Sequence, residues 1–168
     1  MAVDPRTLAS FSGDPGEPAW VAVNDDVMGG RSQGGATIAE GHLHFSGTLS
    51  LANNGGFSSV RTTGRLYDLS GATAMRLRVL GDGRTYQLRL AAGARIRGAA
   101  IAYGAAFATT AGQWTEVRIP FATLTPTFRG QTLDGPPLDL SRVEEIRLLI
   151  GDDREGPFAL VVDWVKAG

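Results

Sequence analysis

The residues of this 168-residue chain that are best suited to chemistry stand together between Asn24 and Ser32. The run contains two adjacent carboxylates, two adjacent glycines and an arginine. In order it reads Asn24, Asp25, Asp26, Val27, Met28, Gly29, Gly30, Arg31 and Ser32. Paired glycines loosen the backbone, and Asn and Asp side chains compete for backbone hydrogen bonds, so the run predicts a shaped loop. Its charged groups could form charge-assisted hydrogen bonds with a partner, and its methionine could make an adaptable apolar contact.

A second glycine turn, Asn53 to Arg61, has the same character, and we expect the two segments to form one surface feature. The leading hypothesis is that this feature binds a partner. The candidate binding residues are Asn24, Asp25, Asp26, Met28, Gly29, Gly30, Arg31, Ser32, Gly55, Gly56 and Phe57. The alternative is that the carboxylates and the arginine form a buried polar network that holds the fold together.

A hydrolase is the first enzyme class to consider, because residues 30–34 match the pattern G-x-S-x-G around Ser32. That motif requires a strand before the serine, a helix after it, and an acid and then a histidine further along the chain. Here a strand is expected after the serine, and the only histidines are His42 and His44, which do not fit that order. We therefore interpret the match as accidental.

Metal and acid–base sites are the next candidates. His42 and His44 share one face of an expected strand, but the sequence offers no evident third zinc ligand, so we expect both to face solvent. Asp152, Asp153 and Glu155 could hold a cation or serve as paired carboxylates, as could the acids of the first motif. We favour turn-capping aspartates. No catalytic residue, metal or cofactor is predicted, and we expect the protein not to be an enzyme.

The composition excludes further classes of function. With no cysteine, the chain has neither disulfides nor thiolate sites. Its only lysine, Lys166, stands in no Schiff-base or phosphate-binding motif. A net charge of -1 does not favour nucleic-acid binding, and we read the arginines at 76, 78, 89, 95 and 97 as a solvated stripe on one sheet face. The high content of arginine, alanine and glycine suggests a bacterial origin.

The elements that must position these residues are short strands. Leu43 and Phe45 alternate with polar neighbours, as do Met75, Leu77 and Val79, and about nine such runs recur at hairpin spacing. The runs predict an all-β sandwich of jelly-roll type. No apolar run approaches the roughly 20 residues of a membrane-spanning helix, and the first residues lack the apolar core of a signal peptide, so we expect a soluble cytoplasmic protein.

The connections are predicted from turn residues. Residues 1–19 form an N-terminal arm with a short edge strand at Leu8 to Phe11, and residues 20–168 form one domain. Turns at Glu40-Gly41 and at Asp82-Gly83 predict hairpins. A long loop is expected over 123–137, followed by a single helical turn with Ser141 as N-cap.

The chain resembles the complex I intermediate-associated protein 30 family from Trp20 to Val165. The shared segments are Trp20, Asn24–Ser32, Asn54–Arg61, Gly81–Tyr86, Trp114–Phe121, Gly156–Phe158 and Asp163–Val165. The resemblance implies a galactose-binding-like β-sandwich of the kind found in many carbohydrate-binding modules. It also implies a chaperone-like role in the assembly of NADH:ubiquinone oxidoreductase, with no catalytic activity. We expect a protein partner, and a carbohydrate-binding module is the alternative.

Overall fold

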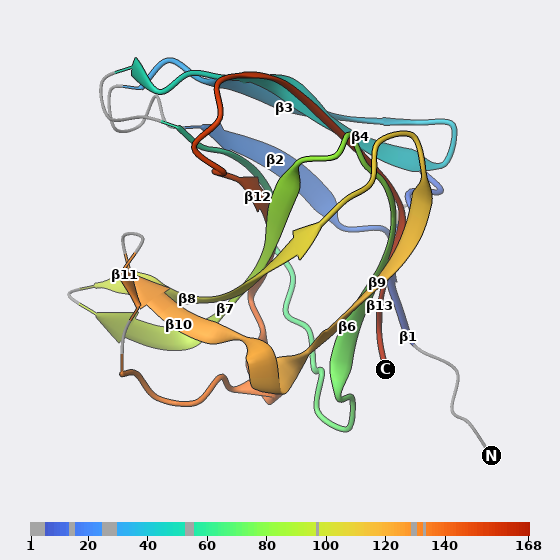
Figure 1. Ribbon diagram of the computed structural model, residues 1–168. Helices are drawn as coiled ribbons and strands as arrows, with labels where there is room; N and C mark the ends of the chain where they lie inside the picture. Colours follow the sequence, from blue (N-terminus) through green and yellow to red (C-terminus); the bar gives the residue numbers. More distant parts are fainter. Residues whose placement is uncertain are drawn as a thin grey trace.

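Two antiparallel sheets packed face to face make up the protein, as the computed structural model shows (Figure 1). The structure describes residues 6–13, 16–24, 30–52, 56–96, 98–128, 131–132 and 134–168. Strands account for almost all of the regular structure in these ranges, and the helical elements are two short 3-10 turns, η3 (Phe121–Thr123) and η4 (Leu140–Arg142). The predicted all-β sandwich is therefore confirmed.

The first sheet, sheet A, has the strand order β3-β4-β13-β6-β9. Its strands are β3 (Gln33–Ala39), β4 (His42–Leu49), β13 (Gly156–Ala167), β6 (Ala74–Leu80) and β9 (Trp114–Pro120). A further short strand, β1 (Arg6–Ala9), pairs with the last residues of β13, beyond the point where the pairing of β13 with β4 ends. The N-terminal segment thereby becomes part of sheet A.

The second sheet, sheet B, has the order β11-β10-β8-β7-β12-β5-β2. Its strands are β11 (Gln131–Thr132), β10 (Thr125–Phe128), β8 (Ala99–Ala108), β7 (Thr85–Ile96), β12 (Glu145–Ile150), β5 (Ser58–Thr63) and β2 (Ala19–Asn24). In Figure 1 this sheet runs as a curved layer from β2 through β12 and β7 to β8 and β10. The strand β2 is an edge strand, so the first motif begins where an edge strand ends.

The core lies between the sheets and is built by the period-2 alternation of apolar side chains. Its largest fully buried side chains are Tyr86, Phe45, Leu43, Leu49, Leu69, Met75, Leu77, Leu88, Leu90, Ile101, Ile146 and Leu148. Burial of one such side chain is worth about 1.5–3 kcal/mol, so these residues supply most of the driving force for folding. The alternation read from the sequence at residues 43–45, 75–79 and 86–90 is confirmed.

One predicted hairpin is confirmed, and the other is wrong. Glu40 and Gly41 both have positive φ, 55° and 76°, and they join β3 to β4 as a tight hairpin turn. The Asp82-Gly83 turn instead carries the chain from β6 in sheet A to β7 in sheet B. Its geometry follows from Asp82, whose carboxylate accepts hydrogen bonds from the hydroxyl of Tyr86 at 3.0 Å and from the backbone N–H of Ala159 at 2.8 Å. Asp82 thus links β7 in sheet B to β13 in sheet A at the point where the chain crosses between the sheets.

The long loop predicted over 123–137 is wrong in part, because the segment contains β10 and β11. Residues 125–127 pair with β8 and extend sheet B, and the hydroxyl of Tyr103 donates to the carbonyl of Pro136 at 2.7 Å. The predicted single turn is η4, but its N-cap is Asp139, whose carboxylate accepts from the backbone N–H of Ser141 at 3.0 Å. Ser141 is therefore inside the turn and not its cap.

The predicted arginine stripe on one sheet face is also wrong. Arg76 and Arg78 belong to β6 in sheet A, whereas Arg89 and Arg95 belong to β7 in sheet B. Arg97 lies outside the described residues. Periodicity within a strand could not show which strands share a sheet.

Over the part of the chain that the structure describes, we find no helix with the length and apolar character needed to cross a membrane.

Candidate functional site

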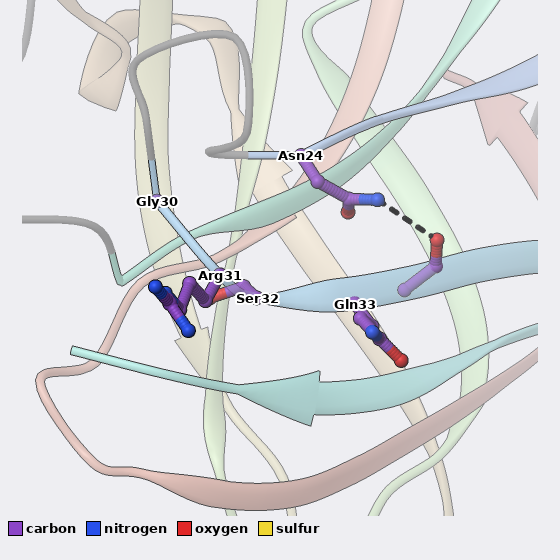
Figure 2. Close-up of a pocket in the computed structure, with 6 residues that line it drawn as sticks. Asn24, Gly30, Arg31, Ser32 and Gln33 are labelled. Carbon is purple, nitrogen blue, oxygen red and sulfur yellow. Dashed lines mark hydrogen bonds between the residues drawn. The ribbon is translucent and has the colours of Figure 1, made fainter. Parts of the chain in front are cut away.

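The first motif borders an open hollow of about 610 Å³ between the end of β2 and the start of β3. The residues that line it are Asn24, Gly30, Arg31, Ser32, Gln33 and Gly34. Figure 2 shows these side chains pointing in different directions, with Asn24 turned toward the backbone of β3 and Arg31 pointing away from Asn24. The residues of the motif therefore serve different purposes.

Asn24 is a structural residue. Its side-chain amide donates to the carbonyl oxygen of Gly34 at 3.0 Å (Figure 2), and its side-chain oxygen accepts from the hydroxyl of Ser58. Ser58 is fully buried, and it belongs to β5, the neighbour of β2 in sheet B. Asn24 therefore ties the end of sheet B to the start of β3 in sheet A.

Gly34, which is not among the predicted binding residues, makes this contact between the sheets possible. A Cβ at this position would lie 2.0 Å from the Oγ of Ser58 and 3.0 Å from the ring of Phe158. Any side chain would therefore push β3 away from β5, because buried atoms at such distances cannot be accommodated without a shift. A glycine is therefore needed here for the close packing of the two sheets.

Ser32 is held by the backbone of the segment that follows β4. Its Oγ donates to the carbonyl of Ser50 at 3.1 Å and accepts from the N–H of Ser50 at 2.9 Å, and the residue is 4% exposed. The strand β3 begins at the next residue, where a hydrolase elbow would need a helix. The structure thus bears out the interpretation that the serine pattern is accidental.

Arg31 differs from Asn24 and Ser32 because its side chain is exposed. It stands one residue before the anchored Ser32, at the rim of the hollow. A fixed backbone that presents an exposed guanidinium is suited to bind a carboxylate or another acceptor group on a partner. Among the described residues that line the hollow, Arg31 is the one whose side chain is charged.

The second glycine turn lies beside a different loop. Gly56 and Phe57 do not line the hollow. They lie close to Gly151 instead: a Cβ added to Gly151 would be 3.4 Å from the carbonyl oxygen of Gly56 and 3.6 Å from the Cβ of Phe57. The two motifs meet instead through the bond between Ser58 and Asn24. Five candidate residues, Asp25, Asp26, Met28, Gly29 and Gly55, lie outside the described residues.

The acidic loop at 152–155 contains a buried ion pair that sequence reasoning missed. Asp152 faces Arg84, with Nε to Oδ2 at 3.0 Å and Nη2 to Oδ1 at 2.5 Å. The remaining donors of the guanidinium bind the carbonyls of Arg154, Gly156 and Pro157, so all five N–H groups have acceptors. No local signal could reveal this pair, because its members stand 68 residues apart in the sequence.

The electrostatics of the pair confirm that Asp152 is a structural anion. Burial is the largest single effect and raises the pKa of its carboxyl, but the hydrogen bonds and charge of Arg84, together with hydrogen bonds from backbone N–H groups, hold the pKa below its ordinary value. The same bonds raise the pKa of Arg84. Of the other two acids, Glu155 accepts from the N–H of Leu51 at 3.0 Å, and Asp153 is exposed. These carboxylates do not face one another as an acid–base pair would.

The two histidines lie on the outer face of sheet A, half-buried. The Nε2 of His42 is 3.4 Å from Asp163, whose other oxygen accepts from Arg78 at 2.9 Å. Arg78 also lies over the ring of Trp114, 4.5 Å from its centroid. His42 is therefore part of a polar cluster rather than a free surface residue. Throughout the described ranges there is no group of three histidines or acids that could hold a metal ion.

The fold defines a class of protein, the galactose-binding-like β-sandwich. Two solved family 11 carbohydrate-binding modules from Clostridium thermocellum are similar to this chain over almost their full lengths. One, from the cellulosomal cellulase Lic26A-Cel5E, has 18% identity and a TM-score of 0.73 and is matched over 100% of this chain and 96% of its own. The other, solved in complex with a β-1,3-1,4-mixed-linked tetrasaccharide, has 16% identity and a TM-score of 0.74. Its match covers 99% of this chain and 96% of the module.

The agarase AgWH50C has 14% identity and a TM-score of 0.63, and the match covers 96% of this chain but 24% of the agarase. At such identities the likeness establishes the fold alone. The family itself is shown by sequence, because residues 9–162 match the model of the complex I intermediate-associated protein 30 family. The chain belongs to that family, as its motifs predicted.

Proposed function

We propose that this protein is a non-enzymatic, protein-binding domain of the assembly-factor kind, and that it engages its partner through the exposed part of the first motif. The observation that carries the proposal is the contrast between Arg31, which is exposed at the rim of the hollow, and its anchored neighbours Asn24 and Ser32. Because the anchored residues restrict the backbone near this charged side chain, less conformational entropy is lost when a partner binds. Membership of the complex I intermediate-associated protein 30 family supports an assembly role.

The absence of an evident reaction centre among the described residues supports a binding role rather than catalysis. The hydroxyl of Ser32 is committed to the backbone of Ser50, and the carboxylate of Asp152 is committed to Arg84. Neither is available as a nucleophile or a general base. In this proposal Asp25, Asp26 and Met28 add contacts beside Arg31, and Gly29 and Gly30 allow the partner to come close.

The test is a pull-down with the purified chain as bait in extracts of the cells that produce it, with bound proteins identified by mass spectrometry. Arg31→Ala, alone and with Asp26→Ala, should remove a specific partner while the melting temperature stays nearly unchanged. Arg118→Ala is the matched control, because Arg118 is an exposed arginine on β9 of sheet A. A partner retained equally by all variants would contradict the proposed site.

A carbohydrate-binding role is the second candidate, and one observation favours it. Trp114 is 38% exposed on the outer face of sheet A, and Asp163, Arg78 and His42 lie around it as hydrogen-bonding groups. Exposed aromatic rings with nearby polar side chains are suited to ligands that present both apolar and hydroxyl surfaces. A glycan array followed by calorimetry decides this candidate: loss of binding in Trp114→Ala supports it, and no binding of any sugar at millimolar concentration rejects it.

A further inference from the structure

Three arginines stand directly opposite one another on adjacent strands of sheet B. In the register of the sheet, Arg147 on β12 pairs with Arg61 on β5 on one side and with Arg89 on β7 on the other. The residues that precede Arg61 and Arg89 and follow Arg147 are fully buried in the core, so all three guanidinium groups lie on the outer face. We call these residues the arginine row. The strands β5, β12 and β7 are neighbours in sheet B.

The arrangement carries an excess of positive charge that the fold does not require. Residues directly opposite each other in antiparallel strands have close Cβ atoms, and like charges in such positions destabilise the sheet. Among the described residues, one carboxylate is bonded to the row, that of Glu145: its Oε1 accepts from Arg147 at 2.9 Å and from Arg61 at 3.3 Å. Three cations and one anion leave a local charge of about +2 on a chain whose net charge is -1.

Some N–H groups of the arginine row have no hydrogen-bond acceptor among the described residues. Arg147 is 23% exposed at its side chain and Glu145 is 16% exposed, so these two side chains are largely sheltered from water, whereas the side chain of Arg61 is 42% exposed. Within the described ranges, the buried Nε groups of Arg61 and Arg147 have no hydrogen-bond partner. Buried donors are normally satisfied, so these two point to an acceptor that the described residues do not supply.

The strand β8, which pairs with β7, has a glycine opposite Arg89 and so leaves space for its side chain. Gly104 on β8 stands opposite Arg89, and a Cβ there would lie 2.9 Å from the Cγ of Arg89. The side chain of Arg89 is further held by Gln87, whose Oε1 accepts from Nε at 3.0 Å and from Nη2 at 2.9 Å. Burial and the charge of Arg147 lower the pKa of Arg89, as crowding of cations should. Arg89 is thus fixed in place despite the repulsion.

We propose that the arginine row binds an oxyanion, a carboxylate or a phosphate, between Arg147 and its neighbours Arg61 and Arg89. The planar guanidinium group matches the geometry of both anions and binds them with paired hydrogen bonds. An anion at this place would satisfy the open donors and offset the repulsion. The row shares no residue with the hollow beside Arg31, so the two sites can be tested separately.

The test is isothermal titration of the chain with two probes, inorganic phosphate and an N-acetylated hexaglutamate peptide, at constant ionic strength. Sodium chloride is the reference, because a diffuse charge effect would respond to it equally. The variants are Arg147→Gln and Arg61→Gln, and Arg118→Gln on sheet A is the matched control. The second variant guards against misfolding, because Arg61 is 42% exposed at its side chain.

We expect saturable binding of at least one probe, with an affinity that falls by about tenfold or more in either row variant, the effect of losing one hydrogen bond between charged groups. Arg118→Gln should bind like the wild type. Binding of phosphate alone would identify a small-anion site, and binding of hexaglutamate alone would identify an acidic protein segment as the ligand. If neither probe binds beyond the chloride reference, or if both row variants bind as tightly as the wild type, the proposal is overturned.

Discussion

The guanidinium of Arg84 and the carboxylate of Asp152 join two crossings between the sheets. Arg84 ends the turn that takes the chain from β6 in sheet A to β7 in sheet B, and Asp152 begins the loop that returns it from β12 in sheet B to β13 in sheet A. Two parallel hydrogen bonds, at 3.0 and 2.5 Å, hold the side chains together. The pair therefore fixes one end of the sandwich, where the chain changes layers twice.

Replacement of Arg84 by methionine should lower the free energy of unfolding by about 3–5 kcal/mol, because it leaves a buried carboxylate without its cation and removes a donor from three carbonyl groups. The side chains of Arg84 and Asp152 are only 8% and 12% exposed, so water cannot replace the lost bonds. Urea unfolding followed by tryptophan fluorescence measures the change. Arg84→Lys should also be strongly destabilised, because an ammonium group cannot reach all of these acceptors at once. A loss below about 1 kcal/mol in Arg84→Met would show the pair to be dispensable.

The same pair predicts a dependence of stability on pH. The pKa of Asp152 is held below its ordinary value of 3.8, because burial raises it by less than the hydrogen bonds and charge of Arg84 and the backbone N–H groups together lower it. A depressed pKa stabilises the folded state above the pKa of the unfolded chain, and this stabilisation is lost as the pH falls through the folded-state value. The stability difference between the wild type and Asp152→Asn should therefore be constant at neutral pH and shrink once the pH falls below 3.8. All other carboxylates are common to both proteins and cancel. A difference that stays constant down to the acid limit would contradict this account.

The sequence predicted the strands of this fold well but not their assembly into sheets. Alternation around Leu43, Met75 and Leu88 marks each core-facing side, because burial on one face leaves a local trace in the pattern. The Asp82-Gly83 turn, by contrast, has the residues of a hairpin and makes a crossing between sheets. At this crossing Asp82 accepts a hydrogen bond from the backbone N–H of Ala159, a residue 77 positions away. Contacts of that range leave no mark in the local sequence.

The same limit applies to the candidate site. The first motif stands out in the sequence by its residue types, but its composition could not divide it into anchored and exposed residues. That division depends on Ser58 and Ser50, the distant partners of Asn24 and Ser32. The arginine row was missed for the same reason: Arg61, Arg89 and Arg147 come from three separate segments, and only the register of sheet B brings them together.

The division of the first motif into anchored and exposed residues can be tested by measuring the free energy of unfolding of single variants. Asn24→Ala should lower the free energy of unfolding by about 1–3 kcal/mol, since it leaves the buried hydroxyl of Ser58 and the carbonyl of Gly34 without their partner. Arg31→Ala should change it by no more than about 0.5 kcal/mol, as is usual for an exposed side chain. Chemical denaturation of both variants under one set of conditions gives the comparison. Equal losses would mean that Arg31 also belongs to the structural network.

Adjacent glycines in β3 offer the sharpest test of how closely the two sheets approach each other. At Gly34 a Cβ would lie 2.0 Å from the Oγ of Ser58, whereas at Gly35 no heavy atom lies within 4 Å of the added carbon. Gly34→Ala should therefore destabilise the protein by about 1–3 kcal/mol, the usual cost of overpacking. Gly35→Ala should leave it unchanged or up to about 1 kcal/mol more stable, because alanine restricts the unfolded chain. Thermal unfolding of the two variants measures both effects, with Ser58→Gly added to Gly34→Ala as the rescue. Recovery of part of the lost stability in the double variant would locate the strain between these two side chains, and a loss that Ser58→Gly does not reduce would place it elsewhere in β3.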